Sequence, residues 1–419
     1  MKSNPTHWLY LEPFVHLTQQ KNHVLLYNTL NRKMFEPALS DEITRLVREL
    51  GVESNGYVIP VDAADLEKET VKQFISRLTR LHMGGLLPVT LSRGKPLNIL
   101  PRPAFKRGLK PYEAGIERPG IRPQDYLHEI SLHLNAGHSE LTRLFPDAFY
   151  QFAFPFGGKQ FGTTLEPSLF TKLLAEFSSL SPLAINIFGA DPAAYSHWVE
   201  LVALLKQTGF SVKYHFSLPQ AAAAPLDTLG RRDKIALFVT FPFYTENLET
   251  IEKLEDDPRK KGRLEYNFIL RDTDDLDKAQ QLIAHFKLRN SFLKPCFTGA
   301  NQQFFEQHVF ITTDDVAGSK PDQKQIFSRI TFNENDFGKF TILPDGTIFA
   351  NVNDPALGNL HSMDGITMIE TEMNKGISWN RTRNRVSPCK SCVYNFLCPP
   401  VSSYEVFFNR FNLCHIYAE

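Results

Sequence analysis

The sequence lacks an excess of charge of either sign and any long apolar run. Lys plus Arg and Asp plus Glu both number 46, so the formal net charge is zero. A nucleic-acid binder needs surplus Lys and Arg to neutralise phosphates, and this balance argues against that class of protein. No stretch approaches the roughly 20 apolar residues of a spanning helix, and the opening MKSNPTHWLYLEPF holds no signal-peptide core. We therefore expect a cytoplasmic protein with no membrane segment and no nucleic-acid partner.

Cysteine is also absent from most of the chain, since none precedes Cys296. The other four, Cys389, Cys392, Cys398 and Cys414, lie within 26 residues. In a reducing compartment thiols stay free, so a tight group of them indicates a metal site rather than a disulfide framework. Cys296 stands apart, and we expect it to be a lone buried thiol.

The 419 residues suffice for two or three domains, and 34 Phe predict cores rich in aromatic packing. Residues 1–87 read as a small module with strands at 9–17 and 24–27 and a third edge at 33–35. A helix is expected after the N-cap Ser40, ending at Gly51, and a second one over 66–82. This outline is winged-helix-like, and zero net charge favours a peptide over a nucleic acid as its ligand.

The next two regions differ in composition. Residues 88–124 are rich in Pro, Arg, Lys and Gly and predict a connector. Residues 125–329 alternate strands and helices, which is typical of βαβ units and a parallel sheet. Strands are expected at 129–134, 150–154, 183–188, 211–216, 234–240, 263–270 and 309–312. The fold class is α/β, as a partial or full barrel with its active face at the strand C-terminal ends, or as an open doubly wound sheet.

Residues 330–419 form a small cysteine-rich metal domain that begins with a hairpin around Pro344-Asp345-Gly346. Its cysteines are separated by two, five and fifteen residues. Four thiolates suit either tetrahedral zinc or a four-iron cluster. Zinc ribbons usually pair one Cys-x-x-Cys with a second, which is missing here, so the spacing favours one 4Fe-4S cluster on all four cysteines.

This segment resembles the SPASM/twitch domain that follows the barrel in many radical-SAM enzymes maturing peptides. Cys389-x-x-Cys392-x5-Cys398 and the later Cys414 match the ligand pattern of the outer auxiliary cluster of that family. Asn351 and Ser402 stand where ligands of the inner auxiliary cluster often lie, so the resemblance implies one auxiliary cluster.

Radical-SAM enzymes also hold a catalytic cluster through Cys-x-x-x-Cys-x-x-Cys after the first barrel strand, and this chain has no cysteine there. The combination resembles the pseudo-radical-SAM proteins that accompany maturases of ribosomally made, post-translationally modified peptides in systems of the Bacteroidales type. The phrases VLLYNTL and CKSCVYNFLCPP carry this resemblance. It implies a non-catalytic partner or scaffold that binds a precursor peptide beside a radical-SAM maturase, without S-adenosylmethionine.

The resemblance further implies a leader-recognition module at the N-terminus. In such a module the peptide adds a strand to a sheet edge. Val24, Leu25, Leu26 and Tyr27 are the residues we expect at that edge.

Two alternatives remain open. An enzyme of different chemistry would use the barrel mouth, with Glu129, His133, Lys159 and Asp191 as candidate groups near the predicted strand ends. A zinc-stabilised interaction protein would use the four thiolates for folding alone.

Overall fold

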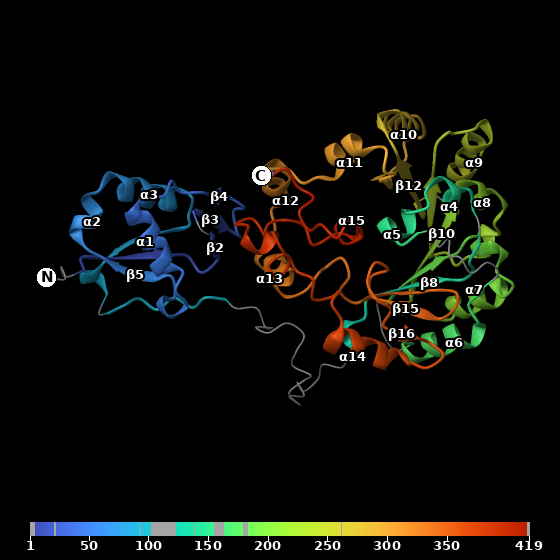
Figure 1. Cartoon of the computed structure of the whole chain (residues 1–419), viewed down its shortest axis with the longest axis horizontal. Helices are drawn as coiled ribbons and strands as arrows, with labels where there is room; N and C mark the ends of the chain where they lie inside the picture. Colours follow the sequence, from blue (N-terminus) through green and yellow to red (C-terminus); the bar gives the residue numbers. More distant parts are fainter. Residues whose placement is uncertain are drawn as a thin grey trace.

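The computed structural model describes residues 5–20, 22–92, 94–101, 123–137, 139–154, 163–178, 183–260 and 262–416. The chain forms an N-terminal module and a large sheet flanked by helices, and α12, α13 and α15 lie between them (Figure 1). Most of the predicted connector, residues 102–122, lies outside the described residues. No described helix has the length and apolar character that crossing a membrane requires.

The N-terminal module contains two three-stranded antiparallel sheets, with strand orders β5-β1-β6 and β2-β3-β4. Its strands are β1 (His7–Leu11), β2 (Val15–Gln20), β3 (His23–Asn28), β4 (Met34–Phe35), β5 (Val58–Val61) and β6 (Gly84–Pro88). Its helices are α1 (Asp41–Leu50), α2 (Ala63–Glu67) and α3 (Glu69–Arg80). The strand predicted at 9–17 is thus two strands of different sheets, because a turn containing Pro13 interrupts it.

Helix α1 confirms its sequence signals. The Ser40 side chain accepts a hydrogen bond from the backbone N–H of Ile43, and the helix ends with Gly51 as its C-cap. Ile43, Leu46 and Leu50 are buried in the module core. The helix predicted over 66–82 is also present, as α3 preceded by the short α2.

The large sheet has nine strands in the order β13-β12-β11-β10-β9-β8-β14-β15-β16. They are β8 (Glu129–His133), β9 (Ala184–Phe188), β10 (Ser211–Ser217), β11 (Lys234–Val239), β12 (Leu264–Leu270), β13 (Ser291–Pro295), β14 (Lys339–Ile342), β15 (Thr347–Phe349) and β16 (Gly358–Asn359). All neighbours from β13 to β14 are parallel. The order from β8 to β13 follows the chain without the reversal of strand order that marks a doubly wound sheet. The sheet is open, with β13 and β16 as its edges, so the described strands do not form the full barrel.

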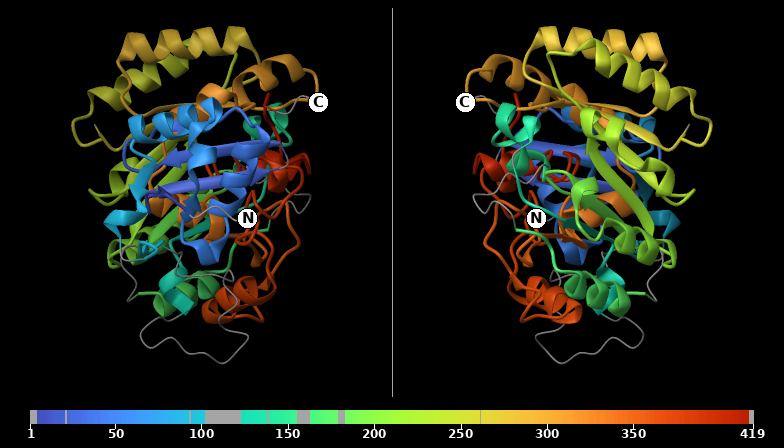
Figure 2. Two further views of the ribbon diagram at one scale, coloured as in Figure 1. Left: turned by 90° about the vertical axis from the view of Figure 1, so that its left-hand side faces the viewer. Right: turned by 90° about the vertical axis from the view of Figure 1, so that its right-hand side faces the viewer.

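Helices cover one face of this sheet, and α12, α13 and α15 lie on the side of the other face (Figure 1). The covering helices are α6 (Pro167–Glu176), α7 (Trp198–Lys206), α8 (Leu218–Ala223), α9 (Thr245–Asp256) and α10 (Thr273–Phe286). Strand residues alternate accordingly: Ile130 and Leu132 join the apolar core, whereas Ser131 lines a cavity on the other face. Figure 2 views the molecule along its long axis, with the N-terminal module nearest the viewer in the left picture.

Two predicted strands are wrong. Residues 150–154 fall largely in α5 (Ala148–Phe152), and residues 309–312 follow the end of α11 (Gln302–Val309). The remaining helices are α4 (Glu140–Leu144), α12 (Thr313–Ser319), α13 (Gln323–Thr331), α14 (Gly365–Lys375) and α15 (Ser403–Phe407). The predicted hairpin is confirmed as β14 and β15, but β14 pairs with β8, so the large sheet crosses the boundary predicted at residue 330.

Gly84 allows a close approach between β6 and β1. A Cβ atom at this position would lie 2.0 Å from the backbone oxygen of Tyr10. We expect Gly84→Ala to lower the free energy of unfolding by about 1–3 kcal/mol, because the clash is with backbone that must move. Gly209→Ala is the matched control, since its Cβ would meet nothing within 4 Å. Chemical denaturation of both variants measures the difference, and equal stabilities would contradict this reading.

Candidate metal centre

Short local hydrogen bonds position the first three cysteines. Cys389 begins a single 3-10 turn (Cys389–Ser391), and the N–H of Cys392 donates to the Cys389 carbonyl at 2.9 Å. A second turn follows, in which the N–H of Cys398 donates to the carbonyl of Tyr394 at 3.0 Å. Both turns fold the chain back on itself and place the three thiols on one compact loop.

Cys414 reaches the same loop through a strand-like pairing. It forms an isolated parallel bridge with Ile311, whose N–H donates to the Leu413 carbonyl at 2.9 Å. The N–H of His415 donates to the carbonyl of Ile311, also at 2.9 Å. The tail is therefore held in place on both sides of the fourth cysteine.

All four cysteines line one cavity of about 360 Å³. Cys389, Cys392 and Cys398 are buried, and Cys414 is partly exposed. The structure thus brings together the four residues that the sequence predicts as ligands, around a space that can receive a metal group. Cys296 lies elsewhere and is a free, buried thiol, as predicted.

The sulfur atoms are too far apart to surround a single ion as they stand. The thiolates of a tetrahedral zinc site lie about 3.8 Å apart, since each Zn–S bond is about 2.3 Å. Among the described residues, three ligand atoms come within 4.8 Å of one another only at Asp272, Asp274 and Asp275. No three of the four cysteine sulfur atoms are that close, so binding of a single zinc ion would require the cysteine side chains to move.

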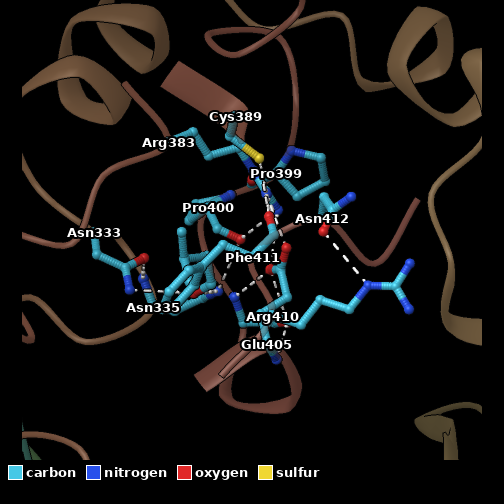
Figure 3. Close-up of polar contacts among 12 residues, drawn as sticks. Asn333, Asn335, Arg383, Cys389, Pro399, Pro400, Glu405, Arg410, Phe411 and Asn412 are labelled. Carbon is cyan, nitrogen blue, oxygen red and sulfur yellow. Dashed lines mark hydrogen bonds and ion pairs between the residues drawn. The ribbon is translucent and has the colours of Figure 1, made fainter. Parts of the chain in front are cut away.

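A buried ion pair organises the loop around the cysteines (Figure 3). Two guanidinium nitrogens of Arg383 donate to the two carboxylate oxygens of Glu405, at 2.9 and 3.1 Å. The same guanidinium donates to the carbonyls of Pro399, Pro400 and Phe411. One of its nitrogens is also 3.5 Å from the sulfur of Cys389. Arg383 therefore connects the residues that follow Cys398 with those that precede Cys414.

Burial favours the protonated form of two of the metal-free thiols, Cys389 and Cys398. It raises the pKa of Cys398 to about 12, although the positive charge of Arg383 acts in the opposite direction. The pKa of Cys389 is also raised by burial and lowered in part by Arg383. The Cys389 S–H donates to the Phe411 carbonyl at 2.9 Å. A metal group must displace these protons, so its binding will weaken as pH falls.

Asn351 and Ser402, the positions of inner-cluster ligands in the resembling family, have other partners here. The amide of Asn351 donates to the buried carboxylate of Asp336 at 3.0 Å. Ser402 is the N-cap of α15 and forms a capping box with Glu405. Both side chains therefore form hydrogen bonds within the protein.

The candidate groups of the barrel mouth do not converge. Glu129 and His133 stand at opposite ends of β8, about 13 Å apart along the strand. Asp191 caps a short 3-10 helix by accepting from the N–H of Ala193. Lys159 lies outside the described residues.

His133 belongs to an aromatic layer at the strand C-terminal ends. Its ring stacks on Phe188 at 5.0 Å, and Phe188 stacks on His215 at 3.9 Å. Phe154 stacks on Phe238 at 3.6 Å. Burial lowers the pKa of His133 to about 3, so this ring is neutral at ordinary pH. Packed rings thus occupy the face where a barrel enzyme places its chemistry.

The strand predicted as a peptide-binding edge does not lie at an edge of its sheet. Val24, Leu25, Leu26 and Tyr27 form β3, which pairs with β2 on one side and with β4 at Leu26 and Tyr27 on the other. Their side chains are buried, alternately in the module core and against the C-terminal region. Strand β3 is therefore the middle of its sheet, and the description of these residues as an edge is wrong.

Sequence reasoning missed a groove of about 600 Å³ beside β4, one of the two edge strands of this sheet. Phe35 of β4 and Phe74 of α3 lie in it, with ring centroids 5.9 Å apart. Lys72, Arg77 and Arg80 line the α3 side, together with a single acidic residue, Glu69. Lys72, Arg77 and Arg80 could have indicated this groove from the sequence, because they lie on the side of α3 away from its buried residues.

Neither a family model nor a curated protein matches this chain. Among solved structures, it is similar to SuiB of Streptococcus suis bound to S-adenosylmethionine, at 12% identity over 97% of both chains with a TM-score of 0.42. SuiB bound to its precursor peptide SuiA matches at 11% identity over 97% of this chain and 100% of that one, with a TM-score of 0.40.

Cys398 tests the ligand assignment. We expect Cys398→Ala to lose the iron and sulfide of anaerobically reconstituted protein, because one iron of the cluster loses its thiolate. Cys296→Ala is the control and should retain the wild-type iron content. Iron and sulfide analysis with visible absorption measures both. Full iron in Cys398→Ala would refute the assignment.

Glu405 tests the ion pair. Glu405→Gln leaves the buried guanidinium without its counter-charge, and we expect a loss of about 3 kcal/mol in the free energy of unfolding. Glu249→Gln is the control, because Glu249 forms an exposed pair with Lys253. Denaturant unfolding of the metal-free variants measures both. A loss below about 1 kcal/mol in Glu405→Gln would show that neighbouring carbonyls alone satisfy Arg383.

Proposed function

We propose that this chain is a non-catalytic, peptide-binding partner in the maturation of a ribosomally made peptide, and that it carries one 4Fe-4S cluster. The observation that carries the proposal is the cavity shared by Cys389, Cys392, Cys398 and Cys414. Its sulfur spacing supports a cluster over a single zinc ion. The resemblance to pseudo-radical-SAM proteins with a SPASM-like tail supplies the biological setting, in the cytoplasm beside a radical-SAM maturase.

The groove between β4 and α3 supports the peptide role. Strand β4 has β3 on one side and no strand on the other among the described residues, so its backbone can pair with an extended peptide. Phe35 offers apolar contact with buried Phe74 behind it, and Lys72, Arg77 and Arg80 offer positive charge. The peptide that fits is extended, with apolar residues next to acidic ones.

The arrangement of the barrel supports a binding role over catalysis. His133 is packed in the aromatic layer, and Asp191 is engaged as a cap. A cluster bound by the four cysteines would supply an electron carrier or a structural anchor. In either case the chain's own residues bind and orient the peptide, and the reaction belongs to the maturase.

Charge reversal tests the groove. We expect the double variant Arg77→Glu, Arg80→Glu to bind an extended peptide of alternating apolar and acidic residues at least about tenfold more weakly, because like charges then face the acidic residues. Arg48→Glu, at an exposed position of α1, is the matched control and should bind as wild type. Titration of a fluorescently labelled peptide gives both affinities. Modification of that peptide by this chain alone would refute the non-catalytic role.

A further inference from the structure

One face of the β2-β3-β4 sheet rests on the loop that carries the cysteines. The cross-strand pairs His16–Tyr27, Thr18–Leu25 and Gln20–His23 share this face, because alternate strand residues point the same way. Leu25 and Tyr27 belong to one apolar cluster with Val393, Leu397 and Cys398. The N-terminal module and the cysteine loop therefore have a common core.

Polar contacts and a ring contact reinforce this packing. The Tyr27 hydroxyl donates to the carbonyl of Pro321 at 2.8 Å, and both groups are buried. The His16 ring meets Phe396 edge to face at 4.9 Å. The side-chain amide of Gln20 donates to the Lys390 carbonyl at 3.2 Å, between the first two cysteines.

The end of this hairpin forms part of the cysteine cavity itself. Gln20, Asn22 and His23 line the same space as the four cysteines, from the opposite end of the chain. Asn395 also lines it; this side chain is 4% exposed, and its Oδ1 has no hydrogen-bond partner. A buried amide without a partner is costly, and a ligand in the cavity would satisfy it once the amide is flipped.

We propose that the β2-β3 hairpin is the lid of the cysteine site, and that Gln20 is the positioning residue that holds it closed. The inference rests on the proposed cluster and adds a residue set that the cysteine motif does not contain. The lid restricts the access of water and chelators to the metal group. Because binding linkage is reciprocal, a loaded site also holds the N-terminal module in place.

The test uses full-length protein reconstituted anaerobically with iron and sulfide, and measures the rate of iron release to excess EDTA. Gln20→Glu keeps the shape of the side chain but removes the amide N–H that donates to the Lys390 carbonyl. The carboxylate that replaces it is repelled by that carbonyl oxygen. We expect it to release iron about threefold to tenfold faster than wild type. Gln19→Glu is the matched control, with the same change on the other face of β2, and should match wild type.

A second pair of variants tests the lid at another contact, so that the proposal does not depend on the folding of Gln20→Glu alone. Tyr27→Phe removes only the hydroxyl that donates to Pro321 and should also release iron faster, whereas Tyr10→Phe, in the other sheet of the module, should not. The thermal midpoint of metal-free Gln20→Glu should stay at the wild-type value, since its contact is exposed. If the protein binds iron but all four variants release it at the same rate, the lid is refuted and the proposed cluster is not. Failure of wild type to bind iron would overturn the proposed cluster and the lid with it.

Discussion

Arg383 and Glu405 form the buried ion pair on which the order of the cysteine loop depends. Taking two charges out of water is costly, and the cost is offset only where the geometry is good and the remaining donors are used. Here the guanidinium donates to both carboxylate oxygens and to three backbone carbonyls. The loop has little regular structure, so its carbonyls need side-chain donors, and a planar fork with five N–H groups supplies them.

The two faces of the large sheet have different surroundings. The helix-covered face carries the apolar core, with Leu132, Ile187 and Leu237 among its buried residues. The other face meets the C-terminal region across a polar cavity of about 680 Å³ and ends in the aromatic layer. The parallel strands thus form a frame whose C-terminal ends are covered by packed rings.

Several features were predictable because a local signal determines them. Ser40 and the apolar spacing after it specify α1, and the Asp345-Gly346 turn specifies the hairpin of β14 and β15. The convergence of the four cysteines on one cavity was also predictable, because they lie within 26 residues of one another in the sequence.

Other features depend on contacts between distant segments. Strand β13 is half exposed at the edge of the sheet and shows no clear alternation, so it was missed. Residues 150–154 look like a strand because they are aromatic, but they pack as a helix over the aromatic layer. The position of β3 within its sheet depends on β4, which is two residues long and gives almost no pattern.

The apolar run of β3 has a consequence for how the molecule folds. A strand with one wet face alternates apolar and polar residues, whereas Val24, Leu25, Leu26 and Tyr27 are apolar without a break because both faces are dry. Leu26 completes one core and Tyr27 the other, so the first and last parts of the sequence share a single strand. The sheet of β2, β3 and β4 therefore buries one face in the module core and the other against the C-terminal region, so removing that region would expose Leu25 and Tyr27 to water.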